Sequence, residues 1–298
     1  MKHDKTLGAI AMILGAILYA SLSIGIRLLY AQGVPESSVT PIFTIVVALS
    51  ATIWSIVFHR DALAVPRVQW FPLLFQGLIG VAAMNFLYYK ALEILPASIA
   101  IMLLFLNPVF IFIFHWVVER KKQPIKRFVA LGLVILGLLA ISGILTEFIT
   151  GTNSIELPLY GVVLATSASL CYGFMQLNVE RRLGGIKPAV IAMYSSSAAS
   201  FVLVLIYGPN NIMNFNITTE SILSLTLLGV FTGLAPLLLI YFALTKIGAF
   251  TTSMIGTIEL PVTALLGYIF LSEQLLSVQW IGMISILIGV VLVQSQKK

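Results

Sequence analysis

One carboxylate lies near the middle of a long apolar run, where an ionisable side chain needs an explanation. The run covers residues 249–271 and carries Glu259. As a helix rising about 1.5 Å per residue it is long enough to cross a bilayer, which puts Glu259 near the hydrocarbon midplane. An acidic side chain there costs about 2.5–3.5 kcal/mol, and such residues usually mark an ion or substrate pathway. The alternative is a neutral Glu259 that hydrogen-bonds to a neighbouring helix.

A proline follows this carboxylate by two positions. Pro261 has no backbone N–H, so the carbonyl of Thr257, four residues earlier, loses its usual helical partner. We therefore expect a kink or an unwound turn beside Glu259, with Thr257 among the residues that line the pathway.

A second apolar run repeats the combination of a polar side chain and a proline. The run at 96–118 carries Asn107 and Pro108 at the place that Glu259 and Pro261 hold in the later run. We predict that Asn107 lines the pathway and that Pro108 kinks its helix.

The composition is that of a polytopic membrane protein. Hydrophobic residues make up 59% of the 298 positions and charged residues 9%, far below the roughly 25% of a soluble domain. The predicted fold class is an all-α membrane protein with ten transmembrane helices and no separate soluble domain. The expected spans are residues 7–30, 41–58, 71–92, 96–118, 128–146, 159–179, 189–207, 221–245, 249–271 and 278–294.

Lysine and arginine alone indicate how these spans are oriented. With ten spans, 15 of the 17 basic residues fall on one side, and only Arg27 and Lys90 fall on the other. Because basic residues stay on the cytoplasmic side, both termini are expected in the cytoplasm. The net charge of +6 is therefore explained by topology, and nucleic acid is not expected as a partner.

The sequence also repeats itself. The run from Gly8 resembles the run from Gly161 at a shift of 153. We predict two five-span repeats, residues 1–147 and 148–298. Because five is odd, equivalent helices would cross the membrane in opposite directions, an inverted-repeat architecture suited to alternating access around a central site.

Equivalent helices of the two repeats carry polar stripes. The side chains recur at every fourth position, which puts each set on one helix face. They are Tyr19, Ser23 and Arg27 in the first span, and Tyr172, Gln176 and Glu180 in the sixth. Polar stripes are disfavoured against lipid, so both are expected to face the pathway, with Arg27 and Glu180 as gates at opposite mouths. Alternatively, Arg27 reaches the headgroups and Glu180 pairs with a neighbouring arginine.

Further polar side chains extend this set. Asn85 and Tyr89 in the third span and Tyr241 in the eighth are predicted to line the pathway, and Pro236 is predicted to kink the eighth span. A buried tyrosine or asparagine also serves as a hydrogen bond between packed helices, and this alternative stays open for each.

Two segments resemble a known transporter family. They are ALEILPASIAIMLLFLNPVF, followed by Glu119, and ALTKIGAFTTSMIGTIELPVTALLGYIFLSEQL. Both are similar to the repeats of the drug/metabolite transporter superfamily, of the ten-helix type with two EamA-like repeats, over residues 8–141 and 161–293. The resemblance implies an exporter of amino acids or other small metabolites in the inner membrane of a prokaryote. Drug export and metabolite import are the alternatives within the same fold.

Other classes of function lack the residues that they need. There is no nucleotide-binding motif, so a gradient must drive transport, with Glu259 as the proton carrier or with facilitated diffusion as the alternative. A membrane-embedded transferase would need a catalytic constellation, and no catalytic, cofactor or metal residues are predicted. The expected partners are a small-molecule substrate, the bilayer and, if transport is coupled, protons. The chain is expected to be a monomer or a weak homodimer.

Overall fold

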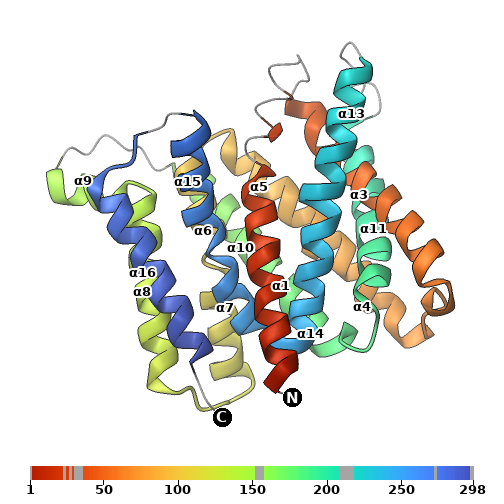
Figure 1. Ribbon diagram of the computed structural model, residues 1–298, viewed down its shortest axis with the longest axis horizontal. Helices are drawn as coiled ribbons and strands as arrows, with labels where there is room; N and C mark the ends of the chain where they lie inside the picture. Colours follow the sequence, from red (N-terminus) through yellow and green to blue (C-terminus); the bar gives the residue numbers. More distant parts are fainter. Residues whose placement is uncertain are drawn as a thin grey trace. The chain divides into compact units, whose positions relative to one another are not determined.

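The computed structural model describes residues 2–22, 25–26, 29, 36–151, 158–208, 218–271 and 274–295. The described residues form helices joined by short connections, with no strand among them (Figure 1). This confirms the predicted class of an all-α membrane protein. The chain divides into two compact units, Met1–Ala83 with Met175–Gly248 and Met84–Phe174 with Ala249–Lys298, which we call unit 1 and unit 2. Each unit draws segments from both halves of the sequence.

The described residues of unit 1 form long helices and several shorter helical pieces. Three π-helical segments (η3, η5, η6) continue α-helices without a break, and two short 3-10 turns (η1, η2) lie between α3 and α4. The elements are α1 (Lys2–Ala20), α3 (Glu36–Phe58), η1 (Arg60–Ala62), η2 (Arg67–Gln69), α4 (Trp70–Phe75), η3 (Gln76–Ala83), η5 (Val179–Leu183), α11 (Pro188–Tyr207), α13 (Thr219–Leu228), η6 (Gly229–Leu234) and α14 (Ala235–Gly256). α14 passes from unit 1 to unit 2 at Gly248.

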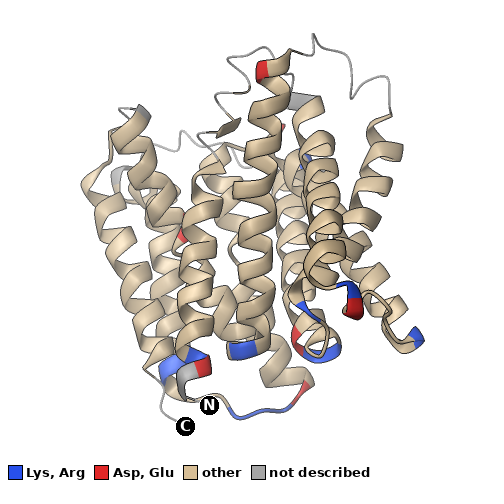
Figure 2. Cartoon of the chain, turned by 45° about the vertical axis from the view of Figure 1, so that its right-hand side comes forward, with Lys and Arg blue, Asp and Glu red and all other residues tan. Residues whose placement is uncertain are grey.

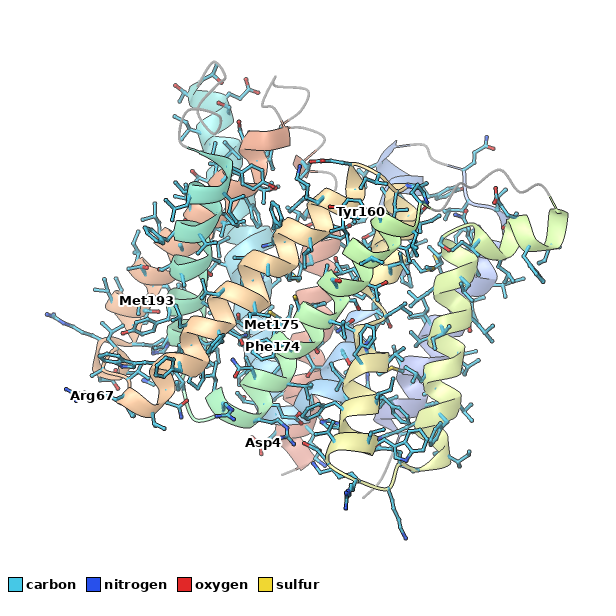
Figure 3. All side chains as sticks on the ribbon, turned by 180° about the vertical axis from the view of Figure 1, so that it is seen from behind. Asp4, Arg67, Tyr160, Phe174, Met175 and Met193 are labelled. Atoms are coloured by element: carbon cyan, nitrogen blue, oxygen red, sulfur yellow. The ribbon has the colours of Figure 1, made fainter. Side chains whose placement is uncertain are left out.

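Unit 2 contains the shorter, interrupted helices and one long helix pair. Its elements are α5 (Met84–Leu92), α6 (Ala97–Leu104), α7 (Asn107–Ile113), the π-helical η4 (Phe114–Val118), α8 (Ile125–Ile141), α9 (Ile144–Thr150), α10 (Leu159–Asn178), α15 (Glu259–Leu271) and α16 (Ser277–Gln294). The boundary with unit 1 crosses α10 between Phe174 and Met175, both labelled in Figure 3.

Equivalent helices of the two repeats pack against each other in unit 2. α8 and α16 lie side by side (Figure 1). A Cβ atom at Gly137 would lie 2.6 Å from the carbonyl oxygen of Gly282, and one at Gly289 would lie 2.9 Å from that of Ala130. A shift of 152 residues converts each of these contacts into the other. Because early residues of α8 meet late residues of α16, the two helices are antiparallel, as inverted repeats require.

Unit 1 repeats this symmetry with another helix pair. A Cβ atom at Gly77 would lie 2.6 Å from the carbonyl oxygen of Ser195, and one at Gly229 would lie 3.8 Å from that of Phe43. The same shift of 152 residues interconverts these contacts. Glycine at both positions lets helices approach closely enough for backbone contact. The internal repeat of the sequence therefore reappears as a repeat of contacts.

Seven stretches of the described residues are long and apolar enough to cross a membrane. They are Ser38–Phe58, Arg67–Leu92, Ala97–Val118, Leu159–Leu183, Pro188–Tyr207, Thr219–Phe270 and Ser277–Gln294. All seven overlap expected spans, and charged residues gather at the ends of the helices (Figure 2). The predicted break at residues 93–96 is confirmed, because α5 ends at Leu92 and α6 begins at Ala97.

One predicted span has the wrong end. Residues 128–146 were expected to form a single helix, but α8 ends at Ile141 and a separate helix, α9, begins at Ile144. Gly143 between them has φ +87°, a left-handed conformation that ends α-helices and that glycine adopts at low cost. The sequence stays apolar across this turn, so hydropathy alone does not reveal the end of the helix.

Candidate substrate pathway

Two interrupted helices lie in unit 2 at equivalent positions of the two repeats. The first break separates α6, which ends at Leu104, from α7, which begins at Asn107. The second separates α14, which ends at Gly256, from α15, which begins at Glu259. Pro108 and Pro261 each lie directly after one of these breaks, and the first residue after each break is a polar side chain, Asn107 or Glu259.

The backbone at the second break is rearranged rather than left unpaired. The N–H of Leu260 donates to the carbonyl of Thr257 at 3.2 Å, and the N–H of Val262 donates to that of Ile258 at 3.1 Å. The expectation that Pro261 leaves the Thr257 carbonyl without its helical partner holds for the i+4 bond, but a tighter i+3 bond replaces it. The Thr257 side chain is fully buried, and its hydroxyl donates to the carbonyl of Met254 at 2.7 Å.

Asn107 is buried, and its side-chain amide has no hydrogen-bond partner among the described residues. Its side chain is 1% exposed, and neither its oxygen nor its nitrogen is paired with another described residue. A buried polar group without a partner costs about 1–3 kcal/mol, so few are found in native structures. Asn107 therefore offers a donor and an acceptor at the start of α7 that the fold itself does not use.

Glu259 is less buried than Asn107. It is the first residue of α15, where a negative charge is favoured by the helix N-terminus, and its side chain is only partly buried. Tyr88 on α5 is close enough to the Glu259 carboxylate for the two side chains to interact electrostatically. An ionisable group that is partly accessible within an apolar segment is the feature expected of a pathway residue.

The neighbouring tyrosines and Asn85 belong to the same unit. Asn85 and Tyr89 lie on α5, and Tyr172 lies on α10; all three are half-buried. The rings of Tyr88 and Tyr89 are 5.6 Å apart and meet edge to face. Unit 2 thus holds Asn107, Glu259, Thr257, Asn85, Tyr89 and Tyr172 of the predicted pathway residues.

Other predicted pathway residues belong to unit 1. Tyr19 is half-buried on α1, whereas Gln176 on α10 is 1% exposed and its side-chain oxygen has no partner among the described residues. Ser23 and Arg27 lie outside the described residues. Pro236 is buried and is the second residue of α14, directly after the π-helical segment η6.

The predicted gate residue Glu180 lies on η5 beside a backbone turn. Its carboxylate occupies the space next to the Cα atom of Gly248, where an added Cβ would be 2.5 Å from Oε1. Gly248 has φ +77°, the one non-helical residue inside α14. A side chain at Gly248 would meet both backbone strain and the Glu180 carboxylate.

Unit 1 contains a buried polar network that was not predicted from the sequence. Asn178 donates from Nδ2 to the carbonyl of Pro72 at 2.9 Å and to Oε1 of Gln76 at 2.8 Å. Gln76 donates from Nε2 to the hydroxyl of Tyr241 at 3.4 Å, and that hydroxyl lies 3.3 Å from Oγ of Ser195. Tyr241, a predicted pathway residue, is fully buried in this network. The signal available in the sequence was the presence of two amide side chains, Gln76 and Asn178, within apolar runs. These residues are 102 positions apart, so no helical spacing rule predicts that they meet.

The equivalent junction in the other repeat is apolar. The counterparts of Gln76 and Asn178 are Leu228 and Gly25, and the Leu228 side chain packs directly against Gly25. Leu228 also packs against a small hydrophobic core. That core consists of Leu29, Val39 and Leu225. One junction of unit 1 is therefore held by hydrogen bonds and its counterpart by apolar contact.

No metal centre is found in the part of the chain that the structure describes. No group of three or more His, Cys, Asp or Glu side chains is close enough to hold an ion there. The arrangement of unit 2 instead offers a neutral amide, a carboxylate and phenol rings. Such groups bind a small polar molecule by hydrogen bonds and charge.

Comparison with known proteins gives a consistent result. The model of the EamA-like transporter family matches residues 6–143 and 159–295. The threonine/homoserine exporter RhtA of Salmonella typhimurium (strain LT2) is 27% identical over 243 residues, covering 80% of this chain and 76% of the relative. RhtA of Escherichia coli (strain K12) is 26% identical over 239 residues, covering 79% and 75%. A solved structure described as "Crystal structure of protein" matches the fold with a TM-score of 0.74, 16% identity and 96% coverage of both chains.

Proposed function

Because the chain belongs to the EamA-like transporter family, and is therefore a secondary transporter rather than an enzyme, we propose that it exports small amino acids across the cytoplasmic membrane of a prokaryote. The substrate class is supported by the relatives at 26–27% identity, which are threonine/homoserine exporters. Drug export and metabolite import are the competing uses of the same fold.

The proposed topology has ten crossings with both termini in the cytoplasm. The stretch Thr219–Phe270 has 52 residues, about 78 Å as a helix, twice what one crossing needs, and it turns at Gly248. If this stretch is divided at Gly248 into two crossings, the seven stretches give eight crossings. Adding α1 and α8 gives ten. α8 has 17 residues, close to the spanning length.

Thiol labelling tests this topology. Cysteines introduced at Ser154 and Asn211 should react with an impermeant reagent added outside the cell, and cysteines at Lys122 and Gly185 should not. The reverse pattern would contradict the proposed orientation. The proposal also assigns residues 1–147 and 148–298 to the two repeats, which the antiparallel packing of α8 against α16 supports.

The observation that carries the proposed mechanism is the pair of interrupted helices in unit 2. Each repeat supplies a break and a polar side chain at its far side, Asn107 in one and Glu259 in the other. We propose that the Glu259 carboxylate accepts hydrogen bonds from the ammonium group of the substrate. In this account the Asn107 amide, which has no partner among the described residues, hydrogen-bonds the substrate's carboxylate or hydroxyl.

The remaining predicted residues complete this proposal. Asn85, Tyr89, Tyr172 and Thr257 form the surroundings of the substrate in unit 2, and Tyr19, Gln176 and Tyr241 belong to the pathway in unit 1. Arg27 and Glu180 act as gates, with Glu180 beside the turn at Gly248. If Arg27 closes the outer mouth, Arg27→Ala should change how fast outside reagents reach pathway cysteines. Unchanged labelling with full transport would instead indicate that Arg27 reaches the lipid headgroups.

The proposed driving force is a proton gradient, with Glu259 as the group that gains and loses the proton. Facilitated diffusion is the alternative. In both cases one protein molecule contains the whole pathway, and the expected oligomeric state is a monomer or a weak homodimer.

Counterflow in proteoliposomes tests substrate class and mechanism together. Vesicles loaded with unlabelled threonine or homoserine should accumulate the labelled amino acid, and Glu259→Gln should reduce gradient-driven export by a factor of about 100, the loss expected for a group essential to transport. Accumulation of a labelled drug with no amino-acid counterflow would contradict the proposed substrate class. A matched control is Leu260→Met, a volume-conserving change at the adjacent, buried position.

A further inference from the structure

The turn between η4 and α8 concentrates basic charge. Five of the eight residues from 120 to 127 are lysine or arginine. Side chains that end in nitrogen project from this turn (Figure 3). The charge is therefore presented outward, at one end of unit 2.

Two of the five basic side chains are used within the protein. Lys121 Nζ lies 2.6 Å from a carboxylate oxygen of Glu119. Arg127 donates to Oε1 of Gln123 at 2.6 Å, and its guanidinium group lies 4.9 Å from the centre of the Phe250 ring. These contacts fix the turn against α14 and α8.

The other three basic side chains have no such use. Arg120, Lys122 and Lys126 are exposed, and none forms an ion pair with another residue in the described ranges. Their charge is therefore not neutralised by any residue in these ranges.

Arg120 also occupies an unfavourable backbone conformation. Its φ is +52°, the only positive φ of a non-glycine residue in the described part of the chain. The turn is closed around it by the N–H of Glu119 donating to the carbonyl of Phe114 and the N–H of Lys121 donating to that of His115, both at 3.1 Å. Glycine would adopt this helix-ending conformation at lower cost. A cationic side chain kept at a strained position suggests a function for the cation.

Exposed aromatic and aliphatic side chains flank the same turn. Trp116 on η4 is 50% exposed and Phe128 on α8 is 38% exposed; their rings are 5.6 Å apart and nearly perpendicular. Ile125 at the start of α8 is 74% exposed. Tryptophan beside basic residues is typical of the boundary between hydrocarbon and headgroups.

We propose that this turn is a binding site for an anionic phospholipid. Arg120, Lys122 and Lys126 contact the phosphate and the acidic headgroup, and Trp116 and Phe128 contact the upper acyl chains. A soluble anion would neutralise the cations but would make no contact with the apolar side chains beside them. A lipid contacts both the cations and the apolar side chains, and we therefore assign the site to a lipid.

Quenching of Trp116 fluorescence tests this site. The full chain, with Trp54, Trp70 and Trp280 changed to phenylalanine, is reconstituted in phosphatidylcholine vesicles containing 10% of a brominated lipid, roughly enough for a few molecules per protein surface. We expect brominated phosphatidylglycerol to quench Trp116 more strongly than the same amount of brominated phosphatidylcholine. The excess quenching should fall by about fivefold in Lys122→Gln and disappear in the triple variant Arg120→Gln, Lys122→Gln, Lys126→Gln.

A charge-matched triple variant separates a local site from general attraction. Arg60→Gln, Arg67→Gln and Arg182→Gln together remove the same net charge from exposed positions of unit 1. This control should retain the excess quenching. Equal quenching by the two brominated lipids in the parent protein would overturn the proposal, and so would an equal loss in both triple variants. The single variant Lys122→Gln keeps the test valid if a triple variant fails to reconstitute.

Discussion

The two interrupted helices of unit 2 share their backbone plan and differ in their chemistry. In both repeats a helix stops, two residues form a turn, and a new helix begins with a polar residue one or two positions before a proline. In the first repeat that residue is Asn107, a neutral amide that is almost completely buried. In the second it is Glu259, an ionisable group whose side chain is partly exposed. The two breaks therefore share their backbone plan, and they differ in the chemical character of the first side chain after the break.

Unit 1 supports the same distinction. The glycine contacts of Gly77 and Gly229 are interconverted by the repeat, whereas Gln76 and its counterpart Leu228 are not alike. One junction is a hydrogen-bonded network and the other is apolar. In the proposed transporter, identical repeats would give two states of equal energy, and differences of this kind would favour one of them.

The largest expected effect comes from breaking the shared frame. Gly137→Leu would drive a side chain into the backbone of α16, because even a Cβ atom would lie 2.6 Å from the carbonyl oxygen of Gly282. We expect a loss of about 3 kcal/mol or more, seen as loss of the folded fraction in detergent on size-exclusion chromatography. Gly132→Leu on the same helix is the control, since nothing lies within 4 Å of a Cβ there. Equal behaviour of the two variants would refute the close packing of α8 and α16.

A smaller effect is expected from making the polar junction resemble its apolar counterpart. Gln76→Leu leaves the side-chain amide of Asn178 and the hydroxyl of Tyr241 each short of a partner, which should lower stability by about 1–3 kcal/mol. Thermal unfolding in detergent measures the change. Adding Asn178→Ala removes one of the unpaired groups and should restore part of the loss. If Gln76→Leu alone is as stable as the parent, the network contributes nothing to the fold.

A substitution at Asn107 should weaken substrate binding without lowering the stability of the protein. Because its amide is unpaired with any described residue, Asn107→Leu should change stability by about 1 kcal/mol or less, in the stabilising direction. Substrate affinity, measured by concentration-dependent counterflow, should fall by about tenfold, the equivalent of one hydrogen bond to a charged group. A destabilised variant with normal affinity would make Asn107 a packing residue.

The sequence predicted these two breaks because proline acts locally. Pro108 and Pro261 each remove a backbone donor, and that effect needs no knowledge of the neighbours. The network around Gln76 depends on helices far apart in the sequence, and Ser195, whose hydroxyl lies 3.3 Å from that of Tyr241, was not among the predicted residues. The end of α8 was missed because the turn at Gly143 interrupts no apolar pattern. The sequence therefore predicts helix breaks that depend on local backbone chemistry, but it does not predict which distant residues meet in the fold.

The smallest expected effect concerns an exposed ion pair of unit 1. The hydrogen bond from Lys187 to Asp61, at 3.2 Å, lowers the pKa of the Asp61 carboxyl below its ordinary value of 3.8. A lowered pKa means that the pair stabilises the folded state at neutral pH and that this contribution is lost as the pH falls through the lowered value. Asp61→Asn should therefore melt slightly below the parent at pH 7, and the difference should shrink as the pH falls below 3.8 and through the lowered pKa of Asp61. A difference that grows on acidification would contradict this assignment.

The most direct test of the central claim measures binding and flux in one reconstituted preparation of Glu259→Gln. Glutamine keeps the size of the side chain and most of its hydrogen-bonding capacity, but it cannot carry a proton. If Glu259 carries the proton, substrate should still change the tryptophan fluorescence of the variant, at a higher concentration because the glutamine oxygen is a neutral acceptor for the ammonium group, while export driven by a proton gradient fails. If gradient-driven export in Glu259→Gln equals that of the parent protein, Glu259 is not the coupling group, and the difference between the two breaks has no part in driving transport.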